Sequence, residues 1–204
     1  MRVAVVVFEG FDELDAIGPL EVLRNAAAMG ATDLSVELVA LDGSAEVTGS
    51  HGLRVRTDGR LDPGRTDLLV IPGGGWNDRG AHGAWAGAER GDLPAAIAAA
   101  SRAGAVVATV CTGAMLAATA GLIRGRPAIT HHGAVEDLRA SGAQVVEARV
   151  VDDGDLVTAG GVTSGIDLAL WLVERHFGAD LAEAVAAEIE HPRHGEVWRS
   201  QGLA

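Results

Sequence analysis

The sequence has no lysine and no tyrosine, and all of its basic side chains are arginine. Without lysine, the chain cannot form a Schiff base with pyridoxal phosphate, and it lacks the lysine of a phosphate-binding P-loop. Without tyrosine, no phenol is available as a general acid or base. The available chemistry therefore rests on carboxylates, seven histidines, hydroxyls, backbone amides and a single thiol.

Positive charge and long apolar runs are also scarce. The formal net charge of −12 argues against a nucleic-acid surface, which needs clustered basic side chains. No stretch reaches the roughly 18 apolar residues of a membrane span, and the N-terminal run lacks a signal-peptide cleavage site. One cysteine cannot form an internal disulfide, which fits a reducing compartment. We therefore expect a cytoplasmic protein with neither nucleic acid nor membrane as a partner.

Apolar β-branched runs, such as residues 2–8 and 67–71, alternate with helical patterns along the chain. This alternation predicts a single-domain α/β three-layer sandwich with a mainly parallel, flavodoxin-like sheet. The domain is expected over residues 1–190, followed by an irregular tail over 191–204.

Two stretches carry local signals of glycine and proline. A helix is predicted over residues 18–30, with Pro19 in its first turn. Residues 76–92 are rich in glycine and lack periodicity, so they are predicted to form a long loop. Within that loop, Trp76 is expected at the rim of a pocket or in a subunit contact.

Cys111 lies where an apolar strand over 105–110 runs into a helix over 112–122. A thiol at this junction is pushed out of the strand toward the positive end of a helix dipole, which favours the nucleophilic thiolate. The serine elbow of hydrolases has the same geometry, although T-V-C-T-G does not match its motif. A lone cysteine is commonly a small buried hydrophobe, but the abrupt turn and Gly113 favour an elbow. Ligand sites of α/β folds lie at the carboxyl ends of strands, where Cys111, residues 73–75 and residues 160–161 should meet.

Three motifs occur together and in order: F-D-E-L-D-A-I-G-P, which contains Asp15; I-P-G-G-G over residues 71–75; and V-C-T-G over residues 110–113. In this combination the sequence resembles the ThiJ/PfpI superfamily, which has the class I glutamine-amidotransferase-like fold. The closest subgroup resembles the isonitrile hydratases, together with the related input domains of AraC-type regulators. The resemblance covers nearly the whole chain.

The resemblance implies a role for each matching residue. Cys111 matches the nucleophile, and Asp15 matches the acidic residue that points at its sulfur. The backbone N–H groups of Thr112 and Gly74 match those that hold developing negative charge. Superfamily proteases carry histidine where this chain has Thr112, which disfavours a peptidase. A simpler interpretation of Asp15 is an acid in the first turn of a helix.

A carboxyl group beside a thiolate has a raised pKa, so Asp15 would keep a proton and serve as a general acid. Cys111 would attack an isonitrile carbon to give a thioimidate. Water steered by Thr112 and the Gly74 amide would then release an N-substituted formamide, with no cofactor. The resemblance also implies a small-molecule substrate and a homodimer.

Four of the histidines lie close together in the sequence in two groups. His131 and His132 follow a strand and are candidates for hydrogen bonds near the elbow, although structural histidines are commoner. Hydratase-like members carry Thr-His-aromatic here, so His132 departs from their pattern. His191 and His194 have helical spacing, but Pro192 interrupts the helix, and no metal site is predicted.

Three alternative functions stay open on the sequence. One is a glyoxalase III-type hydratase of 2-oxoaldehydes, which His131 keeps possible. A second is an amidase or peptidase. The third is a non-enzymatic thiol or ligand sensor, because an exposed cysteine with a low pKa oxidises readily.

Overall fold

The computed structural model describes residues 1–200, and within them eight strands form one central sheet. Its spatial order is β12–β10–β11–β7–β6–β1–β2–β5, and every neighbouring pair is parallel except β10 and β11. The strands of this sheet are β1 (Arg2–Val7), β2 (Ser35–Ala40), β5 (Gly59–Arg60), β6 (Leu68–Ile71), β7 (Val106–Val110), β10 (Val150–Asp152), β11 (Leu156–Ala159) and β12 (Val197–Arg199). The mainly parallel α/β architecture that the sequence predicts is confirmed.

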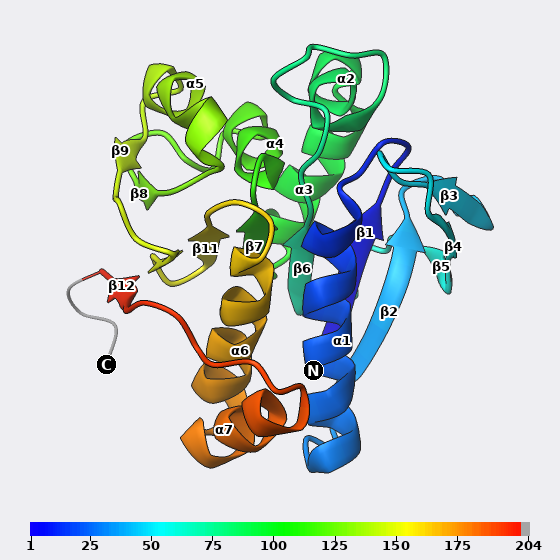
Figure 1. The fold of residues 1–204 in the computed structure, drawn as a ribbon. Helices are drawn as coiled ribbons and strands as arrows, with labels where there is room; N and C mark the ends of the chain where they lie inside the picture. Colours follow the sequence, from blue (N-terminus) through cyan, green and yellow to red (C-terminus); the bar gives the residue numbers. More distant parts are fainter. Residues whose placement is uncertain (201–204) are drawn as a thin grey trace.

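Helices cover both faces of the sheet and make three layers (Figure 1). On one face, α1 packs against α6, and α6 packs against α7. The opposite face carries α2, α3 and α4, which pack on one another. The bounds are α1 (Glu13–Met29), α2 (Gly83–Arg90), α3 (Asp92–Arg102), α4 (Gly113–Thr119), α6 (Ser164–Phe177) and α7 (Ala179–Glu188).

Smaller elements lie outside these layers. The antiparallel hairpin of β3 (Glu46–Thr48) and β4 (Arg54–Arg56) follows β2. Beyond β7, the parallel pair of β8 (Pro127–Ala128) and β9 (Gln144–Val145) flanks α5 (Val135–Ala140) and a 3₁₀ turn over His132–Ala134. No helix within residues 1–200 is long and apolar enough to cross a membrane.

The central strands are apolar because both of their faces are buried. All four residues of β6 and five of the six in β1 are buried. Parallel strands covered on both sides need such continuous apolar runs. Since this core fixes β1, β6 and β7, their carboxyl ends form a rigid rim for the loops that follow them.

Helix α1 begins at Glu13 and not at the predicted Gly18, so Pro19 lies inside it. The proline removes only the hydrogen bond that the carbonyl of Asp15 would accept from position 19. The preceding E-L-D-A-I residues are tolerated well in a helix. The earlier start places Asp15 in the first turn, where it is fully buried.

The predicted long loop over 76–92 is wrong in its second half, because Gly83–Arg90 forms α2. The helix is short, and its apolar residues are mostly alanine and glycine, so it shows little hydrophobic periodicity. Its position depends on packing against α3 and α4, which the local sequence does not reveal.

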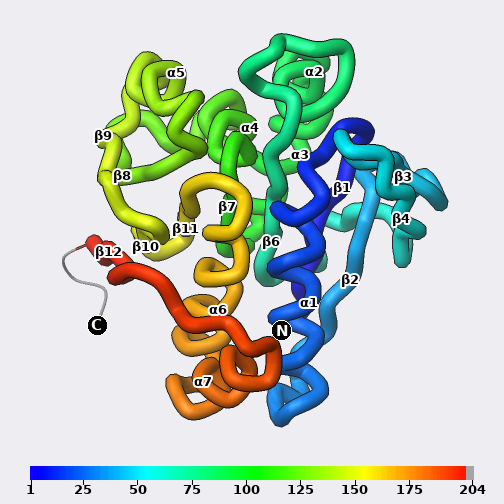
Figure 2. The backbone as a smooth tube through the Cα atoms, viewed as in Figure 1, coloured from blue at the N-terminus to red at the C-terminus, as the bar shows by residue number. Residues whose placement is uncertain are grey.

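The predicted irregular tail also contains structure. After α7 the chain crosses α6 and reaches the sheet edge (Figure 2), where β12 pairs with β10. A three-residue edge strand has too little local pattern to be recognised. Residues 201–204 of the predicted tail lie outside the described residues.

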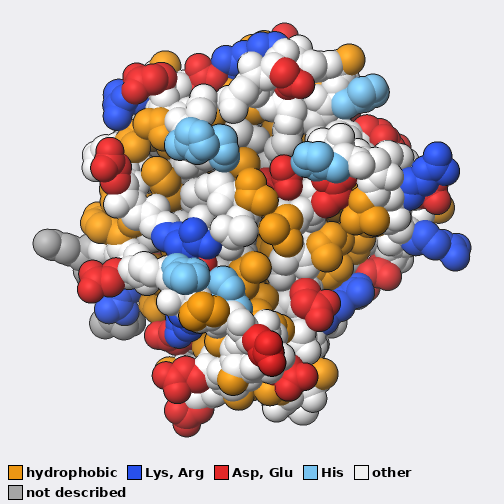
Figure 3. All heavy atoms as spheres, in the orientation of Figure 1, with side chains coloured by type: hydrophobic (Ala, Val, Ile, Leu, Met, Phe, Trp, Pro, Cys, Tyr) orange, Lys and Arg blue, Asp and Glu red, His pale blue; other side chains and the backbone are white. Residues whose placement is uncertain are grey.

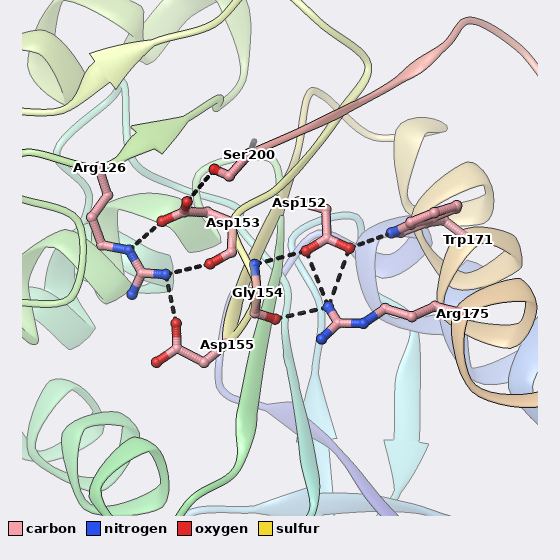
Figure 4. A network of polar contacts seen from close by, with 8 residues as sticks. All are labelled: Arg126, Asp152, Asp153, Gly154, Asp155, Trp171, Arg175 and Ser200. Atoms are coloured by element: carbon pink, nitrogen blue, oxygen red, sulfur yellow. Dashed lines mark hydrogen bonds and ion pairs between the residues drawn. The ribbon is translucent and has the colours of Figure 1, made fainter. Parts of the chain in front are cut away.

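A polar network holds the β10–β11 turn, α6 and the end of the chain together (Figure 4). The buried carboxylate of Asp152 accepts hydrogen bonds from Trp171 Nε1 at 2.8 Å and from Arg175 at 3.0 Å. On the other side of the turn, Arg126 forms ion pairs with Asp153 and Asp155. The carboxylate of Asp153 also accepts a hydrogen bond from the Ser200 hydroxyl.

Candidate active site

Cys111 occupies a strained turn between β7 and α4, with φ at 56°. A non-glycine residue in this conformation costs of order 1–3 kcal/mol, and the surroundings must hold it there. The Cys111 N–H donates to the carbonyls of Ala159 and Gly160 at 3.2 and 2.9 Å, and its own carbonyl accepts the Thr130 hydroxyl at 2.9 Å. The backbone therefore fixes the direction of the sulfur.

Gly113 makes this turn possible. A Cβ atom at this position would lie 2.3 Å from the carbonyl oxygen of Ile71. The first residue of α4 therefore packs directly against the end of β6, and only glycine fits. This contact is the physical reason for the glycine two residues after the cysteine.

Asp15 is fully buried, and its two carboxyl oxygens have different environments. Oδ2 accepts the N–H of Gly73 at 2.9 Å, whereas Oδ1 has no partner of ordinary hydrogen-bond geometry within residues 1–200. The neighbouring Cys111 thiol acts on this carboxyl as a hydrogen-bond donor would, lowering its pKa. Burial and the charge of Asp12 outweigh both donors and raise the pKa of Asp15 to about 7.

Burial and the charge of Asp15 raise the pKa of the Cys111 thiol to about 12, although the N–H groups of Thr112 and Val162 lower it. This corrects the expectation that the helix dipole would favour the thiolate. Helix α4 has only seven residues, and the adjacent carboxylate opposes a second negative charge. The two groups therefore titrate as a pair that holds one proton between about pH 7 and pH 12.

Thr112 is almost fully buried, at 3% exposure, and the glycines after β6 hold its side chain. Its Oγ1 accepts the N–H of Gly74 at 3.0 Å. Gly73 packs so closely on Thr112 that a Cβ atom there would lie 2.4 Å from Oγ1. The Gly74 amide thus fixes the hydroxyl oxygen in this structure, and the hydroxyl proton is free to be donated.

Val162 is a site residue that the sequence analysis missed. It lies in the turn between β11 and α6 with φ at 42°, and its N–H lowers the pKa of the Cys111 thiol as a hydrogen-bond donor would. A β-branched residue with positive φ is a rare outlier that marks a functional or strained position. The signal available in the sequence was the G-G-V-T-S-G turn, which follows a strand as V-C-T-G does.

His131 and His132 lie beside the site but differ in exposure. His131 is half-buried, and its Nδ1 accepts the N–H of Gly133 at 3.1 Å. Its ring fills the space next to Gly161, where a Cβ atom would lie 2.5 Å from Cδ2. Burial and the neighbouring imidazole lower the pKa of His131, so this ring is neutral at pH 7. His132 is exposed, 4.0 Å away between ring centroids.

Trp76 is not at an open rim, because its side chain is 6% exposed. Its Nε1 donates to Asp137 at 2.6 Å, and its ring meets Trp85 edge-on, at 5.1 Å between centroids. The guanidinium of Arg79 lies 4.0 Å from the Trp85 centroid and also bonds Asp137. Trp76 therefore fastens the loop after β6 to α5.

No group of three or more histidine, cysteine or acidic side chains within residues 1–200 is arranged to hold a metal ion. His191 instead bonds the buried carboxylate of Asp167 at 3.1 Å, and the backbone N–H of His194 donates to the same carboxylate. These contacts attach the end of α7 to α6.

Comparison with known proteins gives four related findings. A model of the DJ-1/PfpI family matches residues 1–175. An isonitrile hydratase from Pseudomonas putida is 34% identical over 192 residues, which cover 94% of this chain and 78% of the relative. A deglycase from Thermococcus kodakarensis is 27% identical over 172 residues, which cover 78% of this chain and 89% of the deglycase. The crystal structure of a ThiJ/PfpI family protein from Pseudomonas syringae aligns over 95% of this chain and 76% of its own, with a TM-score of 0.81 and 26% identity.

Proposed function

Because the chain belongs to the DJ-1/PfpI family, we propose that it is a cofactor-independent cysteine enzyme that hydrates small isonitriles to N-substituted formamides. The observation that carries this proposal is the buried pair of Asp15 and Cys111, which keeps a proton next to a nucleophile at neutral pH. An isonitrile carbon needs both, since it accepts a nucleophile and a proton at the same atom. The hydratase relative supports the same reaction class.

In the first half-reaction the sulfur of Cys111 bonds to the isonitrile carbon, and the proton of the pair moves to that carbon. The product is a neutral thioimidate, Cys–S–CH=N–R, so the acid and the nucleophile are both used. The N–H groups of Thr112 and Val162 hold the sulfur while its charge is consumed. Fixed donors of this kind stabilise charge without reorganisation.

In the second half-reaction water adds to the thioimidate carbon. Asp15, now a carboxylate, accepts a proton from the water as the water oxygen bonds to the carbon, and the Thr112 hydroxyl gives its proton to the substrate nitrogen. As the carbon–sulfur bond breaks and the carbonyl forms, the hydroxyl proton of the adduct passes to Thr112, and the proton held by Asp15 returns to the Cys111 sulfur. The sum of both halves is one isonitrile and one water converted to one formamide.

The low exposure of the Cys111 sulfur restricts the size and shape of the substrate group that can reach it. Cys111 is 6% exposed, so only a slender group reaches it. A terminal isonitrile carbon on a linear C–N axis meets this requirement, whereas an internal peptide carbonyl with substituents on both sides does not.

We also propose that the protein is a cytoplasmic homodimer. Hydrophobic side chains gather on the face where α1 and α6 lie (Figures 1 and 3). Leu14, in the first turn of α1, is 38% exposed. Light scattering after size exclusion should give twice the chain mass for the wild type and for Met29→Glu, and the monomer mass for Leu14→Glu. A monomeric wild type would contradict the dimer. Both residues are exposed on α1, so the second variant controls for added charge.

The test of the reaction is product formation from para-nitrophenyl isocyanide, compared with consumption of methylglyoxal. The wild type and an Asp33→Asn control on the surface should form the formamide, whereas Cys111→Ala and Asp15→Asn should not. Methylglyoxal consumption without formamide would replace this proposal by the 2-oxoaldehyde reaction. Turnover of neither compound, with Cys111 oxidised at low peroxide, would replace it by a thiol sensor.

A further inference from the structure

Two adjoining cavities open at the carboxyl edge of the sheet, and neither is lined by Cys111 or Asp15. The first, here the β1–β2 cavity, has a volume of about 370 Å³ and lies beyond the ends of β1 and β2. The second, here the hairpin cavity, has a volume of about 340 Å³ and lies between the β3–β4 turn and the loop after β6. Both are lined by Glu9, Ala81 and His82, so they meet there.

The β1–β2 cavity has apolar walls made of side chains that are otherwise buried. Phe8, Val47 and Leu93 are exposed by 8%, 3% and 1%, and all three line it. Backbone hydrogen bonds fix the loops around it, since the Gly83 N–H donates to the Glu9 carbonyl at 2.8 Å. The cavity is therefore preformed, and its volume lies within the range of small-molecule sites.

The charged side chains around both cavities are mostly carboxylates. Arg90 lines the β1–β2 cavity but lies 3.7 Å from Asp92. The carboxylate of Asp42 is taken by the N–H and hydroxyl of Ser44. Arg79, next to the hairpin cavity, turns away to Asp137 and the tryptophans.

Glu9 is left as the carboxylate shared by both cavities. Its Oε1 accepts one hydrogen bond, from the N–H of Thr48 at 3.2 Å. It forms no ion pair with any residue between 1 and 200. An anionic ligand is repelled here, while a cation finds a partner beside an apolar wall.

We propose that the two cavities form a binding site for a small primary amine with an alkyl or aryl body. The ammonium group pairs with Glu9, and the apolar body lies against Phe8 and Val47. The site is separate from the reactive thiol and does not depend on the proposed reaction. A backbone link to the reactive centre runs through Gly83, whose N–H donates to the Glu9 carbonyl, and Ala84, whose N–H donates to the Gly74 carbonyl at 2.7 Å.

Binding of 2-phenylethylamine to the full chain at pH 7 tests this site, with neutral 2-phenylethanol and anionic 3-phenylpropanoate as matched probes. Calorimetry should rank the amine first and the anion last, and amide NMR shifts should centre on residues 8–9, 41–42 and 81–82. Glu9→Gln should weaken amine binding about fivefold, the upper range for a solvent-exposed ion pair. Glu188→Gln, the same charge change on α7, should leave it unchanged.

Equal binding of the alcohol or of the anion would overturn the proposal, as would shifts centred on Cys111. Thermal unfolding checks that Glu9→Gln folds. If it does not, Val47→Thr, which keeps the shape but adds a hydroxyl to the wall, should weaken the amine, and added salt should do the same. Cys111→Ser should bind the amine as the wild type does, which separates this site from the reaction.

Discussion

At the scale of single residues, one carboxylate influences the whole reactive centre. Asp12 is the N-cap residue of α1, but its side chain makes no cap hydrogen bond. Its charge instead raises the pKa of both Asp15 and Cys111. The sequence indicated Asp15 and Cys111 through their motifs, but nothing in one sequence marked Asp12, because its effect on Cys111 depends on how the start of α1 lies against the turn between β7 and α4.

Asp12→Asn should therefore lower the pKa of Asp15 and of Cys111. The measurement is the pH dependence of Cys111 alkylation by iodoacetamide, which follows the thiolate. Its midpoint should move to lower pH in Asp12→Asn and stay in place in Asp33→Asn. A midpoint that moves upward or not at all would show that Asp12 does not act on the pair.

Asp15 also makes stability depend on pH, and the sign is fixed by its raised pKa. Its protonated form is favoured by folding, so its stabilising contribution is complete below about pH 4 and is lost as the pH rises through about 7. Across this window the free energy of unfolding of Asp15→Asn should rise relative to wild type by up to about 4 kcal/mol. Urea unfolding of both proteins at pH 4 and pH 8 measures this difference in the free energy of unfolding. The same difference at both pH values would contradict a raised pKa of Asp15.

At the scale of elements, the sequence predicted the strand–turn–helix at Cys111 because glycine and a β-branched run are local signals. It did not predict the turn at Val162, whose strain is imposed by β11 and α6 together. Helix α2 and strand β12 were missed for the same reason: short elements take their conformation from partners distant in sequence.

Gly113→Ala tests the close contact between α4 and β6. The added Cβ would lie 2.3 Å from the Ile71 carbonyl oxygen, so the chain must shift at the cost of about 3 kcal/mol of stability. Gly59→Ala is the matched control, because a Cβ atom there meets nothing within 4 Å. Chemical denaturation of both variants should separate them clearly, and equal stabilities would refute the steric reason for Gly113.

At the scale of the whole molecule, the layers and the parallel sheet were predicted because alternating apolar patterns determine them. The polar network of Figure 4 was not, since it joins residues from α6, the β10–β11 turn and the end of the chain. Asp152 is 2% exposed within it, and its carboxylate pairs with Arg175 and accepts a hydrogen bond from Trp171. Removing the cation of this buried pair should therefore destabilise this side of the molecule.

Arg175→Met should destabilise the protein by about 2 kcal/mol, because it leaves a buried carboxylate without its cation; the partial exposure of Arg175 reduces the cost below that of a fully buried pair. Arg139→Met removes an exposed pair with Glu136 and should cost less than about 1 kcal/mol. Thermal unfolding of both variants compares the two costs. Similar losses would mean that burial of Asp152 carries no special penalty.

The most direct test is an NMR titration of ¹³C-labelled aspartate carboxyls in the wild-type protein, with Asp15→Asn to assign the signal. Because Asp15 is buried beside the Cys111 thiol, we expect its carboxyl group to titrate near pH 7. A midpoint near the ordinary aspartate value of 3.8 would contradict the account, because the carboxyl of Asp15 would then be fully ionised at pH 7 in spite of its burial.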